Sequence, residues 1–319
     1  MDFSEIKSFL ESDECDNVTI LTHKSPDGDT LGSGFAMCEM LRSMGKKANV
    51  INNEPFPQRY KEFIYPDYEP MDFEEKCVIA VDIADLNLLG DNLSEYKKEG
   101  KIDLCIDHHI TNKKYAKLYY IDENAAAACQ IVYQLIEFMG RPINKLIATC
   151  LYLGLATDTG CFKFESVTPE THMIAAQLIS YGINHSYINR MMFDVKPKSV
   201  ISVEQQVIGN LQFYFNDRCA VEFVPKALID NSGVEAAEFE DLSTIPLSVE
   251  GVEIGITIKE KGENDYKLSV RTTEKHDASA FCQSFGGGGH LRAAGCQIIG
   301  TYDEVIKKVI DKASELFVN

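Results

Sequence analysis

A pattern that occurs four times in the first half of this 319-residue chain most constrains its fold: a short apolar run is followed within two residues by aspartate or histidine. The runs occupy residues 18–22, 78–81, 104–106 and 151–156. The acidic and histidine residues that follow them are His23, Asp27, Asp29, Asp82, Asp85, Asp107, His108, His109 and Asp158. In open α/β sheets the loops at the carboxyl ends of the strands converge. The pattern therefore predicts that these side chains meet at one site.

The remainder of the first half alternates strand-like and helix-like segments. Short apolar runs predict buried strands at residues 18–22, 48–52, 77–81 and 104–106, and longer segments predict helices at 31–44, 125–139, 144–156 and 169–181. This alternation is typical of a parallel sheet covered by helices. We expect an α/β chain whose N-terminal domain has a parallel sheet with helices on both faces.

The pattern changes after a basic, proline-containing loop at residues 194–198. A single helix is predicted at 199–211, followed by strands at 219–224, 252–259, 266–273 and 297–299 and by helices at 278–284 and 302–317. These segments predict a smaller α/β domain with a mixed sheet. We expect a catalytic domain at residues 1–196, a linker helix at 197–211 and a substrate-binding domain at 212–319.

Composition limits the partners and the compartment. The net charge of −18 argues against binding long duplex DNA, which requires many basic contacts to phosphate. The chain lacks a basic start followed by an apolar core and lacks the roughly 18 consecutive apolar residues of a membrane span. Its ten cysteines form no Cys-x-x-Cys pair, which favours buried free thiols in a reducing compartment. We expect a cytoplasmic protein that does not bind membranes.

The predicted cluster has the chemistry of a metal centre. Carboxylate oxygens mixed with imidazole nitrogens suit Mn²⁺ best among common ions, with Mg²⁺, Fe²⁺ or Co²⁺ as alternatives. Two such ions about 3.5–4 Å apart are the usual arrangement for hydrolysing a phosphate ester. Each piece also has a structural interpretation: Asp27-Gly28-Asp29 as a surface turn, Asp82 as a helix N-cap, and Asp158-Thr159-Gly160 as a helix end.

A glycine-rich segment is the main feature of the second half. Residues 285–295 read Phe-Gly-Gly-Gly-Gly-His-Leu-Arg-Ala-Ala-Gly. Consecutive glycines such as Gly288 and Gly289 let backbone N–H groups approach an anion, and His290 and Arg292 can add charge-assisted contacts. A flexible linker is the usual alternative, but the segment lies between a predicted helix and small residues that pack tightly.

Four ordered motifs together resemble those of the DHH phosphoesterase superfamily. They are His23-x-x-x-Asp27-x-Asp29, Val81-Asp82-Ile83-Ala84-Asp85, Asp107-His108-His109 and Thr157-Asp158-Thr159-Gly160, spread over roughly the first 185 residues. Ile83 and Ala84 stand where relatives often have Thr and Ser. The glycine-rich segment is similar to the signature of the DHH-associated C-terminal domain, so the resemblance extends over nearly the whole chain.

The resemblance implies a centre of two divalent metal ions, most commonly Mn²⁺. It implies that His23 and Asp27 hold the first ion, that Asp29, His108 and Asp158 hold the second, and that Asp82 bridges them. In that family a metal-bridging hydroxide attacks phosphorus. The resemblance further implies that His109 faces the substrate phosphate and that Asp107 supports the two histidines. In the C-terminal domain it implies substrate contacts for Gly288, Gly289, His290 and Arg292, and also for Arg271, for which an exposed strand-end arginine is the alternative.

The compact two-domain length resembles family members that degrade very short RNA to mononucleotides, many of which also dephosphorylate 3'-phosphoadenosine 5'-phosphate (pAp). We therefore expect a substrate that is short single-stranded RNA or a small nucleotide; a homodimer is compatible with the sequence. The motifs do not separate this activity from hydrolysis of cyclic di-AMP or of its linear product pApA. A manganese-dependent pyrophosphatase or polyphosphatase and a catalytically silent nucleotide sensor are further alternatives.

Overall fold

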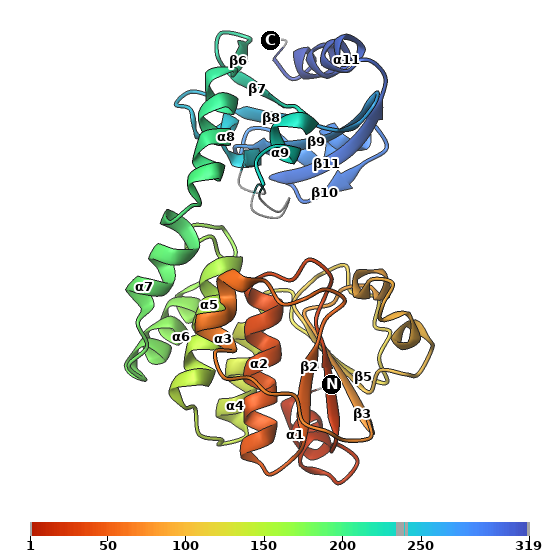
Figure 1. The fold of residues 1–319 in the computed structure, drawn as a ribbon, viewed down its shortest axis with the longest axis vertical. Helices are drawn as coiled ribbons and strands as arrows, with labels where there is room; N and C mark the ends of the chain where they lie inside the picture. The colour runs from red at the N-terminus through yellow and green to blue at the C-terminus, as the bar shows by residue number, and fades with distance from the viewer. Residues whose placement is uncertain (1, 234–238, 240–241, 318–319) are drawn as a thin grey trace. The chain divides into compact units, whose positions relative to one another are not determined.

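The computed structural model describes residues 2–233, 239 and 242–317. The chain divides into two compact units, Met1–Val195 and Lys196–Asn319, and each is described by itself (Figure 1). None of the helices in the described part of the chain combines the length and the apolar character needed to cross a bilayer. All ten cysteines are free thiols, and nine of them are buried.

The first unit is built on a five-stranded sheet in the order β2-β1-β3-β4-β5, in which every neighbouring pair is parallel. Its strands are β1 (Val18–Leu21), β2 (Ala48–Ile51), β3 (Cys77–Val81), β4 (Leu104–Asp107) and β5 (Leu118–Ile121). The predicted parallel sheet is therefore confirmed. The prediction omitted β5, which is half-buried along its whole length at the edge of the sheet.

Helices of the first unit pack mainly on one face of this sheet. The α-helices are α1 (Phe3–Glu11), α2 (Gly28–Ser43), α3 (Lys61–Ile64), α4 (Ala128–Phe138), α5 (Lys145–Asp158), α6 (Pro169–Ser180) and α7 (His185–Asn189). Residues of α1, α2, α4 and α5 form one large core with alternate residues of the strands, and Figure 1 shows α2, α4 and α5 side by side. One 3₁₀ helix, η1 (Gln58–Tyr60), precedes α3, and a π-helical turn, η4 (Arg190–Asp194), follows α7.

The opposite face of the sheet has a smaller core. The other set of alternate strand residues, such as Leu21, Val78 and Cys105, packs there against Leu89 and Tyr96. Leu89 belongs to the 3₁₀ helix η2 (Leu86–Leu89) and Tyr96 to η3 (Ser94–Lys97). Both faces are thus covered, as a buried parallel sheet requires, but the cover on this face comes from short 3₁₀ helices and from loop residues such as Ile102 and Ala116.

The strand order fixes where a ligand site can form. From β1 the chain crosses to β2 on one side and then returns to β3 on the other side of β1. Such a reversal leaves a crevice at the carboxyl ends of the two strands on either side of the switch, here β1 and β3. The residues directly after β1, β3 and β4 are those that the sequence singled out.

The second unit contains a six-stranded mixed sheet in the order β10-β11-β9-β8-β7-β6, in which only β7 and β8 run parallel. Its strands are β6 (Gln212–Tyr214), β7 (Cys219–Val224), β8 (Ile254–Gly262), β9 (Asp265–Thr272), β10 (Gly288–Gly289) and β11 (Ala293–Ile299). Its helices outside residues 234–241 include α8 (Lys198–Gly209), α9 (Lys226–Asp230), η6 (Pro246–Ser248), α10 (Ala278–Gln283) and α11 (Tyr302–Ser314). The predicted mixed sheet is confirmed.

Helices α10 and α11 bury one face of the second sheet, where Val221, Ile256 and Leu268 meet Phe281 and Val309. Helix α8 also packs within this unit: its buried residues Val200, Val203 and Val207 form a small cluster with Val224, Phe239 and Leu242.

Candidate metal centre

Six acidic and histidine side chains of the first unit lie together at the carboxyl ends of the strands. They form two groups of three whose ligand atoms are within 4.8 Å of one another, His23–Asp27–Asp82 and Asp29–His108–Asp158. A third group of the same kind joins Asp82 to His108 and His109. The structure thus brings together every residue that the sequence suggested as a metal ligand, with Asp82 in contact with both groups.

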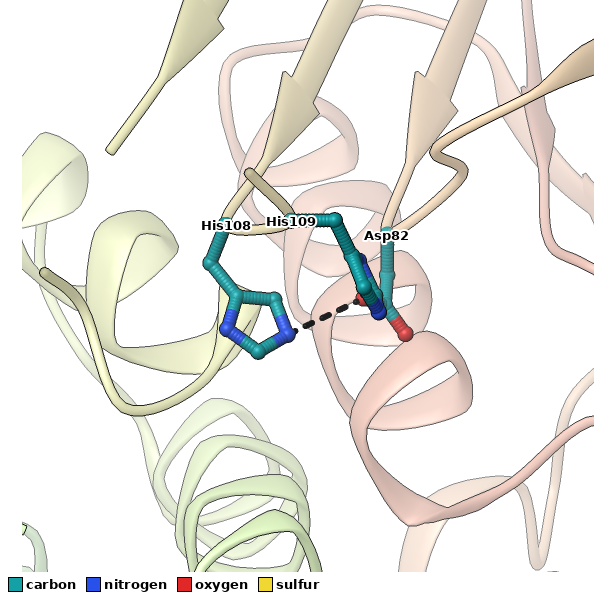
Figure 2. Close-up of side chains that lie close together, drawn as sticks. All are labelled: Asp82, His108 and His109. Carbon is teal, nitrogen blue, oxygen red and sulfur yellow. Dashed lines mark ion pairs between the residues drawn. The ribbon is translucent and has the colours of Figure 1, made fainter. Parts of the chain in front are cut away.

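Asp82 occupies the centre of this arrangement. Its backbone has a φ of 56°, in the left-handed region, and its N–H donates to the carbonyl of Ile106 at 2.9 Å. One carboxylate oxygen, Oδ2, lies 3.5 Å from His23 Nε2, and the other, Oδ1, lies 3.5 Å from His108 Nε2. Figure 2 shows Asp82 and the histidines approaching each other from the ends of two strands.

The carboxylate of Asp82 is buried with too few hydrogen bonds to offset the cost of removing its charge from water. The residue is 2% exposed, and its Oδ1 has no hydrogen-bond partner within the described part of the chain. Burial, reinforced by the negative charge of Asp29, raises the pKa of Asp82 well above its ordinary value. An isolated buried carboxylate is costly, and paired charges or a metal ion are the usual compensation. The orphaned oxygen fits a bound cation.

His23 and Asp27 form the first side of the centre. The Nδ1 of His23 contacts the carbonyl of Lys24 at 2.8 Å, which leaves Nε2 toward Asp27 Oδ2 at 3.7 Å. Burial alone would lower the pKa of His23, but Asp27 and Asp82 raise it to about 11. Asp27 is also the N-cap of α2, because its Oδ1 accepts from the N–H groups of Asp29 and Thr30, both at 3.0 Å.

Asp29 lies in the first turn of α2 but caps a different helix. Its two oxygens accept from the N–H groups of Ala128 and Cys129 at 2.7 and 2.9 Å, at the start of α4. The N-cap residue of α4, Ala127, has no side chain able to do this. Burial raises the pKa of Asp29, although His108, 3.9 Å away, acts in the opposite direction.

These caps explain two errors in the predicted helices. We expected helices to begin at residues 31 and 125, whereas α2 begins at Gly28 and α4 at Ala128. Asp27 extends α2 backward by capping it, and Asp29 receives the first N–H groups of α4 from about 100 residues away in the sequence. The second interaction has no local sequence signal.

His108 and Asp158 complete the second side of the centre. His108 Nδ1 contacts the carbonyl of Ala125 at 3.2 Å, and its Nε2 lies 3.4 Å from Asp158 Oδ2. Asp158 is the last residue of α5. Burial raises the pKa of Asp158 well above its ordinary value, and the negative charges of Asp29 and Asp27 reinforce this. A negative charge at a helix C-terminus interacts unfavourably with the helix dipole, so the ionised carboxylate of Asp158 destabilises the folded state.

Asp107 orients His109. Asp107 is fully buried, and its Oδ1 lies 2.8 Å from His109 Nδ1 and accepts from the backbone N–H of His108 at 2.8 Å. Burial opposes ionisation of Asp107, but its contacts with His109 hold its pKa below the ordinary value. Because an ionised carboxylate only accepts, Nδ1 of His109 carries a proton. Its Nε2 remains available for another partner.

Sequence reasoning missed Asn112, which supports Asp107 from the other side. The Nδ2 of Asn112 donates to Asp107 Oδ2 at 2.6 Å and to the carbonyl of Ile83 at 3.1 Å. It thereby ties the loop after β4 to the loop after β3. An asparagine in a turn is common for backbone reasons, so the sequence contained no signal for this role.

The glycine-rich segment of the second unit forms a tight hairpin. Gly288 pairs with Gly295 across the β10–β11 ladder, and His290 N–H donates to the carbonyl of Ala293 at 2.8 Å. A Cβ added at Gly287 would lie 2.3 Å from the carbonyl oxygen of Gly295, and a Cβ added at Gly289 would lie 2.6 Å from Ala294 Cα. A Cβ added at Gly288 would meet open space.

The two arginines suggested for substrate contact lie near this hairpin. The Nη1 of Arg292 donates to the carbonyls of Thr273 and His276 at 3.0 and 2.7 Å. Arg271 is directly opposite Ala293 in the β9–β11 ladder. His290 is exposed at the turn. The register therefore gathers these residues at one edge of the second sheet, where Arg292 also has a structural role.

Comparison with known proteins agrees with these features. Residues 17–155 match the DHH family, N-terminal domain, and residues 216–319 match the DHHA1 domain. The chain is 30% identical to the bifunctional oligoribonuclease and PAP phosphatase NrnA of Thermus thermophilus, over 93% of this chain and 89% of that protein. The solved structure of an exopolyphosphatase-related protein from Bacteroides fragilis superposes with a TM-score of 0.87 at 27% identity, over 98% of this chain and 95% of that one.

A more distant relative has a different named activity. The cyclic-di-AMP phosphodiesterase GdpP of Bacillus subtilis is 21% identical over 95% of this chain. The match spans only 48% of that longer protein.

Proposed function

Because this chain belongs to the DHH family of phosphoesterases, we propose that it hydrolyses short oligoribonucleotides to mononucleotides and converts pAp to AMP. The observation that carries the proposal is the central position of Asp82, buried with one orphaned oxygen between two groups of acidic and histidine side chains. The near full-length relationship to an oligoribonuclease and PAP phosphatase supports the substrate class.

We propose that two divalent cations, most favourably Mn²⁺, bind at this centre. His23 and Asp27 would hold one, Asp29, His108 and Asp158 the other, and Asp82 would bridge them. Mixed carboxylate and imidazole donors suit Mn²⁺, and Mg²⁺, Co²⁺ and Fe²⁺ are alternatives. When bound, the cations supply Lewis acidity at the phosphate and activate water for attack on phosphorus.

The protein groups around the cations have separate tasks. Asp107 accepts a hydrogen bond from Nδ1–H of His109, and the doubly protonated imidazolium form of His109 would donate from Nε2–H to a phosphate oxygen and stabilise the charge that develops there. Asn112 keeps Asp107 in place. Asp29 also fixes the start of α4, which couples the geometry of the proposed metal ligands to the packing of the helices.

We propose that the first unit carries out hydrolysis, that residues 197–211 link it to the second, and that the second unit binds the nucleotide. The hairpin at Gly288, Gly289 and His290, together with Arg271 and Arg292, forms the proposed substrate-contact region. The acidic net charge of −18 is compatible with substrates that have few phosphates and need no long basic groove. A cytoplasmic location agrees with the ten free cysteines.

Hydrolysis of cyclic di-AMP or pApA is the second candidate function. It is favoured by the similarity to a cyclic-di-AMP phosphodiesterase, although this chain matches only about half of that protein. The same metal-binding side chains would serve either substrate, so the centre does not distinguish between them.

A product assay with Mn²⁺ distinguishes the candidates. The substrates are a 5'-labelled RNA pentamer, pApA, cyclic di-AMP, pAp and pyrophosphate, and Asp82→Ala is the inactive control. Release of mononucleotides from the pentamer and AMP from pAp, with little attack on cyclic di-AMP, is the expected result. Preference for cyclic di-AMP, or use of pApA alone, would favour the second function, and cleavage of pyrophosphate alone would contradict both. A catalytically silent sensor would show no metal-dependent turnover when EDTA treatment is followed by addition of Mn²⁺.

A further inference from the structure

The turn that follows Asp158 has an unusual backbone. Gly160, Cys161 and Phe162 have consecutive φ values of 56°, 59° and 64°, all in the left-handed region. Two of them are not glycine, and such residues adopt this conformation only when their surroundings enforce it.

Thr159 enforces this turn. Its Oγ1 donates to the carbonyl of Leu155 at 2.6 Å and accepts from the N–H of Phe162 at 3.0 Å. Its carbonyl accepts from the N–H groups of Lys163 and Phe164 at 2.9 and 3.2 Å. Thr159 itself is fully buried at the end of α5. The turn is therefore a fixed support attached to the helix that ends in Asp158.

The two phenylalanines of this segment point to different environments. Phe162 packs against the first unit, with its ring 5.4 Å from the ring of His172 and 6.1 Å from that of Tyr152. Phe164 is 57% exposed. Its ring lies against Gly160, where an added Cβ would be 2.5 Å from Phe164 Cζ. Gly160, which is two residues after Asp158, thus leaves room for the ring of Phe164.

A second exposed apolar side chain lies close in sequence to His108, the residue that contacts Asp158. Ile110 comes directly after His109 and is 73% exposed. His108 and Asp158, which precede these two exposed residues in the chain, are 3.4 Å apart through Nε2 and Oδ2. The segments that follow β4 and α5 at the candidate metal centre therefore each contain an apolar side chain that the core does not bury.

We propose that the ring of Phe164 stacks on a nucleobase of the oligonucleotide whose phosphate lies at the metal centre, which makes Phe164 a substrate-positioning residue. This inference rests on the proposed function. Stacking on an aromatic side chain suits a substrate of mixed sequence, because every base presents a π-face. The turn held by Thr159 fixes the backbone of Phe164 relative to Asp158, which reduces the freedom that binding would otherwise remove.

The test compares Phe164→Leu and Phe164→Trp with wild type on two substrates, pApA and the same dinucleotide with both bases absent. We expect Phe164→Leu to raise KM for pApA by roughly 5- to 150-fold, the effect of removing one base–aromatic contact, with kcat little changed. Phe164→Trp should keep KM near the wild-type value. Neither variant should alter hydrolysis of the abasic dinucleotide.

Phe138→Leu is the matched control, because Phe138 is 51% exposed in the same unit. It is the last residue of α4, and the first residue of that helix contacts Asp29, so the helix rise separates the two ends by roughly 15 Å. This variant should keep the wild-type KM.

An unchanged KM for pApA in Phe164→Leu, or an equal loss on both dinucleotides, would overturn the stacking proposal while leaving the proposed function intact. Failure of the wild-type protein to cleave pApA or any RNA would instead remove the proposed function, and the inference with it.

Discussion

Asp158 offers a test in which activity and stability should change in opposite directions. It ends α5, whose last turn lies wholly in the described part and contains no basic residue. Burial and the nearby Asp29 and Asp27 raise its pKa, so ionisation of this carboxyl favours the unfolded chain. Replacing it by asparagine keeps the shape of the side chain and removes the charge. We therefore expect Asp158→Asn to be inactive and, without metal, more stable than wild type.

The size of this gain follows from the geometry. A partly buried charge of unfavourable sign at a helix end costs up to about 2 kcal/mol, and in a unit of this size each kcal/mol moves Tm by about 2–4 °C. We expect Asp158→Asn to melt about 2–8 °C above wild type in EDTA at pH 8. The penalty exists only where the carboxyl ionises in the unfolded chain, so the difference should disappear below about pH 4, near the ordinary pKa of aspartate.

Addition of Mn²⁺ should reverse the order. A ligand at 100 times its Kd stabilises the folded state by about 2.7 kcal/mol, and Asp158→Asn should lose most of this gain. Thermal unfolding of both proteins in EDTA and in Mn²⁺ measures all four values. Glu137→Gln is the control, because Glu137 is an exposed acidic residue in the last turn of α4. It should keep the full Mn²⁺ gain. An Asp158→Asn protein that gains as much from Mn²⁺ as wild type would refute the assignment.

Two further predictions address Asp107 and Glu222. Asp107→Asn removes the charge that holds His109 Nδ1; losing a charge-assisted hydrogen bond of about 1.5–3 kcal/mol should lower kcat roughly 10- to 150-fold, with the Mn²⁺-induced rise in Tm retained. A kcat within twofold of wild type would contradict this role. Burial raises the pKa of Glu222 to about 7 from 4.5, so its penalty of about 3 kcal/mol is absent below pH 4.5 and complete above pH 7. Glu222→Gln can keep the 2.7 Å hydrogen bond from Thr257. In denaturant unfolding, this variant should therefore be more stable than wild type at pH 8 and nearly equal to it at pH 4.5. A difference in stability that does not depend on pH would contradict the assignment.

The sequence predicted the meeting of the acidic and histidine residues because parallel strands end at one edge. Asp82 and Asp107 follow or end buried strands that are neighbours in the sheet, so their proximity needs only the strand order. The sequence did not predict β5 or α1. Strand β5 has an apolar sequence, Leu-Tyr-Tyr-Ile, so the apolar signal was present there and the prediction did not use it.

The glycine-rich segment shows a different limit of sequence reasoning. We interpreted its glycines as an approach to an anion, but Gly287 and Gly289 have no room for a Cβ against β11. Only Gly288, of the residues from 287 to 289, faces open space. Glycines in one run can therefore be required for different reasons: some because no side chain fits against the neighbouring strand, others because a ligand could approach the open backbone. The strand register is needed to tell which reason applies at each position.

For the acidic turn Asp27-Gly28-Asp29, the structural and the functional interpretations are compatible. Asp27 was open to two interpretations, a turn residue or a metal ligand, and its two oxygens serve different partners. Oδ1 caps α2, and Oδ2 lies toward His23. Asp82 differs, because its Oδ1 has no hydrogen-bond partner among the described residues and its pKa is raised, whereas His23 and backbone N–H groups hold the pKa of Asp27 below its ordinary value. The carboxylate that the fold leaves uncompensated is therefore the one that the proposed bridging role requires.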